Sequence, residues 1–497
     1  MMMKTKLLVS LVRAVLSSIS LGVVALAQLA SAAPAVNYLL LEGSELIDSC
    51  PVCGRPDIIV PVQGSLQLRF IQEGPLVSTY AVEDISLVGG TPGGNYYKIV
   101  GQGTCQVGGE VALFQDWSLE LQISNGFTTT LCYFTNGTRA VTRLWPMIAI
   151  GLDQTNGTLL QQFHLDLAAA PFREIWFSTL HPFHAGTWQP PTNYVSAGDL
   201  LSSSGRILRR NAELTRNLGI MPIVPDVGLK DVDILPGGEV AFSMDQDMFS
   251  ESLGPLTSGD LLTDRGRIMA RNAGLVSAFV PQPPVQNMGL NAVQVLDSGE
   301  IYFSVQTNFF SEALGQEIRH GDLLSSRGVI VRKNESLLAR FGLANPKADY
   351  GLKAVYVWPS GEVWFSTETG FADTNSTQYL AGDLLSDQGY VVYRNLALLS
   401  SFAPIEDLFN FGLDALFVVT DVTPSPKPAL CLEISVPPGT RDVSLHFESQ
   451  GRAFQLLKAA DLPGPWLPAS RIGLDLEFTD WGALNGQPQG FYQLRSW

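Results

Sequence analysis

A four-fold internal repeat constrains the fold of this chain more than any other sequence feature. The tetrapeptide Gly-Asp-Leu-Leu begins at Gly198, Gly259, Gly321 and Gly382, in steps of 61, 62 and 61 residues. In each copy an apolar run ending in Phe-Ser precedes the tetrapeptide, and an Arg-Asn or Arg-Lys-Asn sequence follows it. Repeats of this kind occur in solenoids and propellers, where each unit completes its core against its neighbours.

Each repeat unit has the periodicity of short β-strands. In the third copy, residues 289–296 and 300–305 are β-rich runs joined by Asp297-Ser298-Gly299, which predicts a hairpin. Residues 322–332 predict a second hairpin, and a short helix is expected from Asn334, whose side chain would cap it. Four strands in 61 or 62 residues predict one blade of a β-propeller.

The phase of the repeats predicts how the array ends. The first copy starts at Glu174 with no clear strand before it, whereas the last copy ends in residues 412–419 with no partner strand after them. We expect residues 412–419 to pair with residues 174–179, which would close a four-bladed ring without an open sheet edge. The alternative is that residues 163–167 fill the first gap locally and give an open array or a fifth, degenerate blade.

Alternating runs on both sides of the repeats predict an all-β protein with flanking sandwiches. Residues 118–123 are one such run before the repeats, and about five more follow a Pro-rich segment after them. The expected order is a signal peptide (1–32), an N-terminal β-sandwich with four cysteines (33–168), a propeller-like ring of four repeats (169–420), a linker (421–428) and a small C-terminal β-sandwich (429–497).

The first 32 residues have the features of a secretory signal peptide. Lys4, Lys6 and Arg13 precede an apolar stretch that ends at Leu29, and residues 30–32 (Ala-Ser-Ala) offer a small-x-small cleavage site. We expect cleavage and export, so the mature chain would be secreted, periplasmic or at the extracellular surface, with no membrane span. The alternative is an uncleaved signal anchor, for which the apolar stretch is short.

Composition argues against nucleic acid as a partner. The chain has 47 acidic and 31 basic residues, and its formal net charge of −16 would repel phosphate. No Gly-x-Ser-x-Gly elbow, His-Glu-x-x-His helix, phosphate loop or dinucleotide fingerprint occurs. The sequence therefore assigns no catalytic residue and no cofactor, with calcium as the one ion considered.

The five cysteines are unevenly distributed. Cys50, Cys53, Cys105 and Cys132 lie in the N-terminal module, whereas Cys431 stands alone. In an oxidising compartment the first four are disulfide candidates in any of three pairings, which the sequence does not rank. The Cys-Pro-Val-Cys spacing also leaves a metal site or a redox motif open, and Cys431 leaves pairing between chains open.

The repeated aspartates are the candidate calcium ligands, because calcium prefers carboxylate and carbonyl oxygens. They are Asp199, Asp260, Asp322 and Asp383. The alternative is that each aspartate accepts hydrogen bonds from the backbone of its own turn, because a residue present in every blade generally serves the blade. The repeated Arg-Asn asparagines are likewise expected to be helix caps.

A ligand site on a repeat scaffold is expected where the copies differ. The first copy departs most, with an insertion that holds His181, His184 and Trp188 before Gly198. These three residues are the candidate ligand-binding loop. The alternative is an ordered loop in which the imidazoles bond to backbone groups, since no further metal ligand or acid–base partner can be placed from sequence.

Two parts of the sequence resemble known proteins. The repeats, with Gly-Asp-Leu-Leu and Glu-Ile-Trp-Phe-Ser-type strands, resemble uncharacterised secreted bacterial β-propeller-like repeat proteins. The tail, with Gly464-Pro465-Trp466 and Phe491-Tyr492-Gln493, is similar to small β-sandwich modules at the ends of large secreted bacterial proteins. The resemblance implies architecture and no particular activity.

Three functions are compatible with these features. The leading hypothesis is an exported, non-catalytic binding or scaffold protein that presents a propeller face to an extracellular glycan or protein. The alternatives are a secreted hydrolase or lyase acting on an extracellular polymer, and a structural component of the cell surface. The binding hypothesis predicts exposed aromatic side chains on one face, and the enzyme hypothesis predicts a cleft with converging polar side chains.

Overall fold

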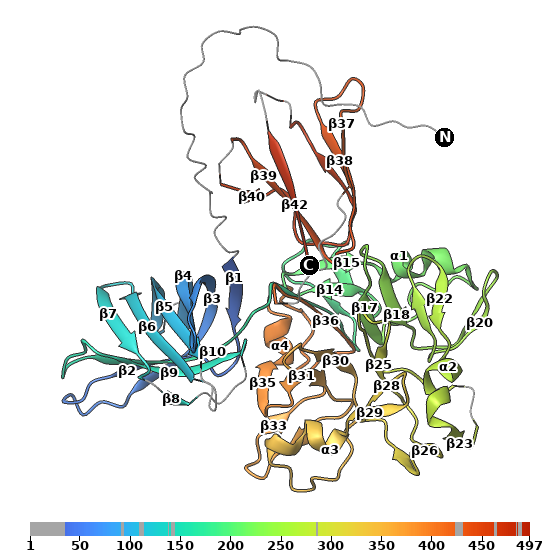
Figure 1. Ribbon diagram of the computed structural model, residues 1–497, viewed down its shortest axis with the longest axis horizontal. Coiled ribbons are helices and arrows are strands. Elements are labelled where there is room, and N and C mark those ends of the chain that lie inside the picture. Colours follow the sequence, from blue (N-terminus) through green and yellow to red (C-terminus); the bar gives the residue numbers. More distant parts are fainter. Residues whose placement is uncertain are drawn as a thin grey trace.

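The computed structural model describes most of the chain after the expected signal peptide. The described residues are 35–90, 94–108, 114–137, 139–140, 145–284, 287–422, 431–461, 465–483, 485 and 490–497. The expected signal peptide (1–32) and the prolines of the expected linker lie outside them. The prediction of an all-β protein is confirmed, because antiparallel sheets dominate and the helices are short. Figure 1 shows an N-terminal sheet, the repeats and a C-terminal module as three adjoining bodies.

The N-terminal module is one ten-stranded antiparallel sheet that closes on itself. Its strands are β1 (Ala35–Leu40), β2 (Glu45–Ser49), β3 (Ile58–Glu73), β4 (Val77–Gly90), β5 (Tyr96–Gly108), β6 (Phe114–Ser124), β7 (Thr129–Thr135), β8 (Arg139–Ala140), β9 (Ile148–Gln154) and β10 (Gln162–Ala170). Strands β2 to β7 pair in sequence order, β7 pairs with β9, and β10 pairs with both β9 and β2. The expected two-sheet sandwich is therefore replaced by a single closed sheet.

Strand length explains this difference. Strands β3 and β4 span 16 and 14 residues, and their ladders shift register near Gln67 and Ile85. Such irregularities bend a strand and increase its twist, so one sheet can curl around its own core. Alternate residues of β6 are buried from Gln115 to Ile123, and they include the core residue Trp117.

The repeats form four four-stranded antiparallel sheets. Listed from outer to inner strand, the first contains β15 (Arg206–Arg209), β14 (Leu200–Ser202), β11 (Glu174–Ser178) and β36 (Ala415–Val419). The second contains β22 (Arg267–Ala270), β21 (Leu261–Thr263), β18 (Val240–Ser243) and β17 (Asp231–Ile234). The third contains β29 (Val329–Arg332), β28 (Leu323–Ser325), β25 (Ile301–Ser304) and β24 (Ala292–Val295). The fourth contains β35 (Tyr390–Tyr393), β34 (Leu384–Ser386), β31 (Val363–Ser366) and β30 (Ala354–Val357).

The predicted pairing between the two ends of the array is confirmed. Strand β36 of the last copy pairs with β11 of the first, with Glu174 opposite Val419 and Ser178 opposite Ala415. The inner strands also contact one another in a cycle, from β17 to β24, β30, β36 and back to β17. The alternative for residues 163–167 is wrong, because they belong to β10 of the N-terminal sheet.

Small sheets and short helices connect the larger sheets. The small strands are β12 (Phe183–His184), β13 (Tyr194–Val195), β16 (Ile220–Met221), β19 (Met248–Ser250), β20 (Gly254–Leu256), β23 (Pro281–Gln282), β26 (Phe309–Ser311), β27 (Gln316–Ile318), β32 (Phe371–Ala372) and β33 (Gln378–Tyr379). The helices are α1 (Asn211–Thr215), α2 (Asn272–Val276), α3 (Asn334–Leu337) and α4 (Asn395–Leu398), and 3-10 turns follow the first three at Arg216–Leu218, Ser277–Phe279 and Ala339–Phe341. The small sheets were not predicted, because two- and three-residue strands leave little periodicity to detect.

In three of the four copies the serine of the repeated Phe-Ser sequence joins neighbouring sheets. The hydroxyl of Ser304 donates to the carbonyl of Leu352 at 3.0 Å, which links the third sheet to the fourth. Equivalent bonds lead from Ser178 to Leu229 and from Ser366 to Leu413. These serines are fully buried, so the bonds satisfy backbone carbonyls that water does not reach.

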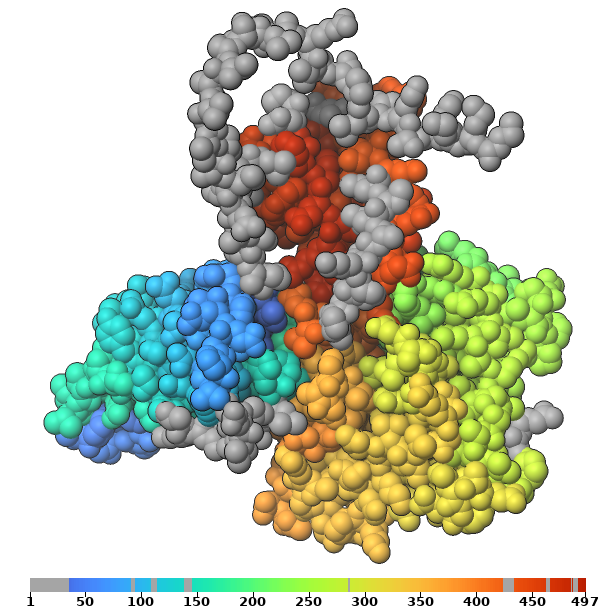
Figure 2. Space-filling view, in the orientation of Figure 1, coloured from blue at the N-terminus to red at the C-terminus, as the bar shows by residue number. Residues whose placement is uncertain are grey.

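The C-terminal module consists of two three-stranded sheets. One contains β37 (Cys431–Ser435), β38 (Val443–Glu448) and β41 (Glu477–Asp480), and the other contains β40 (Leu467–Pro468), β39 (Phe454–Ala459) and β42 (Phe491–Ser496). Val443, Leu445 and Leu456 form the small core between them. In Figure 2 this module lies against the repeats, next to the N-terminal sheet.

Asp421 links all three modules. Its carboxylate accepts hydrogen bonds from Arg173 Nε of the first repeat at 2.8 Å and, in the C-terminal module, from Arg495 Nη2 and Trp497 Nε1, both at 2.7 Å. The backbone N–H of Asn37 in β1 also donates to it, at 3.4 Å. Burial by itself would raise the pKa of Asp421, but the two arginines outweigh it and hold the pKa below its ordinary value. The first residue of the expected linker is thus a fixed junction.

Candidate functional site

Each aspartate of the Gly-Asp-Leu-Leu motif lies in a different sheet and holds a local turn. One oxygen of Asp383 accepts from the backbone N–H of Asn395 at 3.0 Å, and the other accepts from Leu380 N–H at 2.9 Å and Arg394 Nη1 at 2.8 Å. The two backbone contacts recur in the other copies, at Asp199, Asp260 and Asp322. Among the residues that the structure describes, no three His, Cys, Asp or Glu side chains are grouped to hold a metal ion.

The surroundings of two of these carboxylates, Asp199 and Asp322, affect their protonation. Burial raises the pKa of Asp199 and of Asp322 above the ordinary value for aspartate, and hydrogen bonds from backbone N–H groups offset part of that shift. The carboxylates are therefore occupied as acceptors inside their own repeats, and burial limits their contact with solvent.

The asparagine that follows each aspartate is a buried clamp and not a helix cap. Asn395 Nδ2 donates to the carbonyls of Gly382 at 3.1 Å and Gly412 at 3.0 Å, and Asn395 Oδ1 accepts from Phe411 N–H at 2.7 Å. The residue before it, Arg394, occupies the N-cap position. The prediction of an asparagine cap is wrong, because the side chain points back to the motif turn. A Cβ on Gly382 would lie 2.5 Å from Asn395 Nδ2, which explains the glycine of the motif.

The N-terminal cysteines form one disulfide. Cys50 and Cys53 are bonded to each other, whereas Cys105 and Cys132 are buried free thiols on β5 and β7. Of the four disulfide candidates, Cys50 and Cys53 are therefore bridged, and Cys105 and Cys132 are not. Burial raises the pKa of Cys132 to about 11 and that of Cys105 still further, so both are inert, protonated core residues.

The predicted ligand-binding loop lies where the last repeat meets the first. We call residues 180–195 and 403–411 the closure loops. Their backbones are joined by hydrogen bonds from Ile405 N–H to the carbonyl of His184 at 3.0 Å and from His181 N–H to the carbonyl of Phe411 at 3.0 Å. Trp188 packs on Phe402, with ring centroids 5.6 Å apart, and so contributes to the core more than to the surface.

Of the three predicted loop residues, His184 is the one whose side chain bonds to a polar group of the described residues. Its Nδ1 lies 2.7 Å from Glu406 Oε1, and its backbone N–H donates to the same carboxylate at 2.9 Å. Burial by itself would raise the pKa of Glu406, but the bonds from His184 outweigh it and the pKa lies below the ordinary value. Tyr194 contacts the imidazole edge-on at 5.3 Å. No serine, threonine or cysteine hydroxyl or thiol of the described residues bonds to this imidazole, so the arrangement suits binding more than nucleophilic catalysis.

Both closure loops carry exposed apolar side chains. Phe409 is 74% exposed and Ile405 is 65% exposed, and Leu408, Leu180 and Tyr194 are each more than 40% exposed. Sequence reasoning found the His184 side of this surface but missed the 403–411 side. The two sides are 222 residues apart at the His184–Glu406 pair, and only ring closure brings them together.

Sequence reasoning also missed a set of buried charges on the ring axis. Lys230, Asn291, Lys353 and Asp414 follow the Gly-Leu pair in the four copies, and all are buried. Lys353 Nζ lies 3.6 Å from Asp414 Oδ1. Burial raises the pKa of Asp414 to about 6 and that of the neighbouring Asp231 to about 7, and burial lowers the pKa of Lys230. The sequence does contain one sign of this set: the residue after Gly-Leu differs among the four copies, whereas the Gly-Leu pair itself is repeated.

Comparison with known proteins identifies no family for this chain. A scan against protein-family models gives no match, and a search of curated proteins finds no similar sequence. In the described part of the chain, no helix has the length and apolar character needed to cross a membrane. The structure supports the general part of the resemblance noted from the sequence. The chain is an all-β protein with many small antiparallel sheets.

Proposed function

We propose that this protein is an exported, non-catalytic binding protein in which the repeats form a four-bladed β-propeller that presents the closure loops to an extracellular protein. The single observation that carries the proposal is the apolar surface around Ile405, Leu408 and Phe409, held in place by the His184–Glu406 pair. Contiguous exposed apolar side chains with a polar rim are typical of interaction sites.

The propeller is supported by strand pairing and by the arrangement of the sheets. Strand β36 completes the first sheet, and the inner strands of all four sheets contact each other around one axis. Export is supported by the signal features of residues 1–32 and by the Cys50–Cys53 disulfide, which is typical of oxidising compartments.

A protein partner fits these side chains better than a glycan does. Ile405 and Leu408 supply aliphatic surface, whereas sugar rings stack on flat aromatic faces. Phe409 would be the anchor, because exposed aromatic side chains that become fully buried dominate binding energies at interfaces. The hydrolase or lyase alternative has less support at the closure loops, because Glu406 is occupied by His184.

The experiment is site-specific crosslinking in the source cells. A photo-crosslinking residue at position 409 of the exported chain should give a covalent adduct with one protein. The same residue at position 127 is the matched control, because Phe127 is 97% exposed but lies on the N-terminal sheet side of the molecule. Phe409→Ala should then weaken binding of the identified partner about tenfold or more, and Phe127→Ala should leave it unchanged.

Three results would overturn the proposal. Identical adducts at positions 409 and 127, or no adduct at position 409, would show that the closure loops bind no specific protein. Release of reducing ends when the purified chain is incubated with extracellular polysaccharides would favour the hydrolase or lyase alternative.

A further inference from the structure

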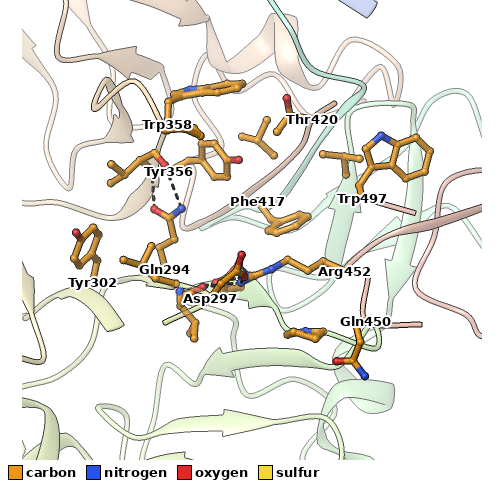
Figure 3. A pocket seen from close by; sticks show the side chains of 18 residues that line it. Gln294, Asp297, Tyr302, Tyr356, Trp358, Phe417, Thr420, Gln450, Arg452 and Trp497 are labelled. Carbon is orange, nitrogen blue, oxygen red and sulfur yellow. Dashed lines mark hydrogen bonds and ion pairs between the residues drawn. The ribbon is translucent and has the colours of Figure 1, made fainter. Parts of the chain in front are cut away.

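A cavity of about 310 Å³ lies between the repeats and the C-terminal module. It is at the end of the ring axis opposite Lys230, Lys353 and Asp414, which precede the inner strands. Its walls come from the inner strands and the turns that follow them, from Tyr302 of β25, and from Gln450, Arg452 and Trp497 of the C-terminal module. Figure 3 shows these side chains around a common space. The volume lies at the small end of the range of roughly 300 to 1,000 Å³ that is usual for ligand pockets, which suits one small molecule.

The copies differ from one another where they line this cavity. The third residue of the inner strand is Asp233, Gln294, Tyr356 and Phe417 in the four successive sheets. A position that only supported the blade would be expected to repeat, as Gly-Asp-Leu-Leu and Phe-Ser do. Four different side chains at one end of the axis make an asymmetric lining, which a specific ligand requires.

The lining combines aromatic side chains with aliphatic and polar ones. Tyr302, Tyr356, Trp358 and Phe417 come from the repeats, and Trp497 comes from the C-terminal module. Tyr356 and Trp358 are edge-to-face, with centroids 5.1 Å apart. Aromatic rings of this kind offer flat apolar surfaces together with polar edges, so they suit a ligand that is itself apolar on its faces and polar at its rim.

The charged groups of the cavity are already paired. Arg452 Nη1 donates to Asp233 Oδ2 at 3.2 Å and to the carbonyl of Ile234 at 2.6 Å, and Nη2 donates to the carbonyl of Val295 and to Asp297 Oδ1, both at 2.9 Å. One guanidinium therefore faces two carboxylates. This balance repels an anionic ligand and leaves no unpaired arginine to bind one.

Hydrogen-bonding groups remain for a neutral ligand. No described residue bonds to the hydroxyl of Tyr356, and burial raises its pKa well above the ordinary value, so the phenol stays protonated as a donor. Asp297 is 72% exposed in its side chain and Gln450 is also exposed, so both are accessible at the rim. The cavity is thus apolar inside with donors and acceptors around it.

We propose that this cavity binds a single neutral pyranose ring, the terminal sugar of an extracellular glycan. The C–H faces of such a ring would pack on Tyr302, Tyr356 and Phe417, and its hydroxyl groups would bond to Tyr356, Asp297 and Gln450. The proposal is independent of the closure loops, which lie where the first and last repeats join. The C-terminal module is part of the site, because it supplies Arg452 and Trp497.

The test is titration of the full mature chain with neutral hexoses and N-acetylhexosamines, followed by calorimetry and tryptophan fluorescence. At least one sugar should bind saturably and change the emission, because Trp358 and Trp497 line the cavity. Tyr356→Phe should weaken binding by about five- to tenfold, the equivalent of one hydrogen bond, with no loss of folding. Tyr302→Ala should weaken binding about tenfold through loss of a stacking face.

The controls separate this proposal from the proposed function. Tyr194→Phe removes a tyrosine hydroxyl at the closure loops and should leave sugar binding unchanged. Tyr356→Phe should in turn leave crosslinking at position 409 unchanged. The proposal is overturned if no neutral sugar binds at millimolar concentration, if uronic acids bind as well as neutral sugars, or if Tyr356→Phe and Tyr302→Ala both bind like the unaltered chain.

Discussion

Two regions of this molecule close β-structure into a ring, and they fill the enclosed space in different ways. The N-terminal sheet encloses an apolar core that includes Trp117 and Phe134. The repeats instead place polar and charged side chains on their axis, including Asp231, Asp233 and Lys353. Both regions are antiparallel and both are closed, so closure by itself does not determine the chemistry of the interior.

The difference follows from the location of the sheet edges. In the described part of the N-terminal module, neighbouring strands are hydrogen-bonded around the circle from β2 through β7 to β9, β10 and back to β2, so the circle has no open edge. In the repeats each inner strand is the edge of its own sheet, and its unpaired backbone groups face neighbouring sheets. Side chains satisfy them: Asp233 Oδ2 accepts from Val295 N–H at 2.6 Å, and Gln294 bonds to both backbone groups of Val357.

The largest expected effect concerns the apolar core of the N-terminal sheet. Trp117→Ala should lower the stability of the N-terminal sheet by about 3 to 5 kcal/mol, because a fully buried indole is replaced by a cavity in a single shared core. Hydrogen exchange followed by mass spectrometry should show lost protection in β5, β6 and β7. Protection in β24 and β25 of the third sheet should stay unchanged, and equal loss there would contradict the separation of the two cores.

The next prediction concerns the buried carboxyl group of Asp231, on the polar axis of the repeats. Burial raises its pKa to about 7, so between pH 3.8 and 7 the folded chain holds a proton that the unfolded chain has released. Its contribution therefore favours the folded state more as pH falls, by about 2 to 3 kcal/mol between pH 7.5 and pH 5. Asp414, with a pKa of about 6, acts in the same direction.

Urea denaturation at a series of pH values, with protection of the inner strands measured by hydrogen exchange, checks this prediction. The repeats should gain stability from pH 7.5 to pH 5, and Asp231→Asn should remove most of that gain. A variant with the pH dependence of the unaltered chain would show that Asp231 does not titrate in this range.

The asparagine clamps test how far the copies are equivalent. Asn395→Ala should cost about 2 kcal/mol, because it removes three buried hydrogen bonds of 2.7 to 3.1 Å. Asn334→Ala should cost about half as much, because that side chain makes two longer bonds, of 3.3 and 3.4 Å. Chemical denaturation of the two variants side by side measures the ranking, and the opposite order would show that bond geometry does not set the clamp strength.

The smallest expected effect concerns the disulfide of the N-terminal sheet. Replacement of Cys50 and Cys53 by serine should cost about 1 to 2 kcal/mol, because the bridge spans only three positions in the sequence and constrains little of the unfolded chain. The bridge lies between β2 and β3 and does not join the strands that close the sheet. Thermal melts of the oxidised chain and the serine variant give the difference, and loss of the folded N-terminal sheet would contradict this account.

The local parts of the fold were predictable from the sequence. The hairpins of residues 292–304 and 323–332 and the helix at Asn334 are present as expected, because turn residues and strand periodicity act over short distances. The role of Asn334 was not predictable, since a cap and a clamp have the same residue at the same helix start. The choice depends on whether a carbonyl such as that of Gly321 lies within reach.

The candidate sites were predictable only in part. His181, His184 and Trp188 were found because the first copy departs from the repeat, and of these His184 lies at the exposed closure loops. Ile405 and Phe409 gave no signal, because exposed apolar residues in a loop are common in any sequence. The cavity was missed entirely, since Arg452 and Trp497 are far from the repeats in sequence.

By itself the sequence determined the number of repeats, their hairpins and the pairing of β36 with β11, because these follow from a fixed period and from a strand missing at one end and left over at the other. Tertiary structure alone decided that the N-terminal strands form one closed sheet and that the ring axis is polar. The bonds of Asp233 to Val295, Gln294 to Val357 and Arg452 to Val295 span 62, 63 and 157 residues. These bonds satisfy backbone groups at the sheet edges that face each other only once the four sheets have assembled. No local sequence pattern therefore predicts them.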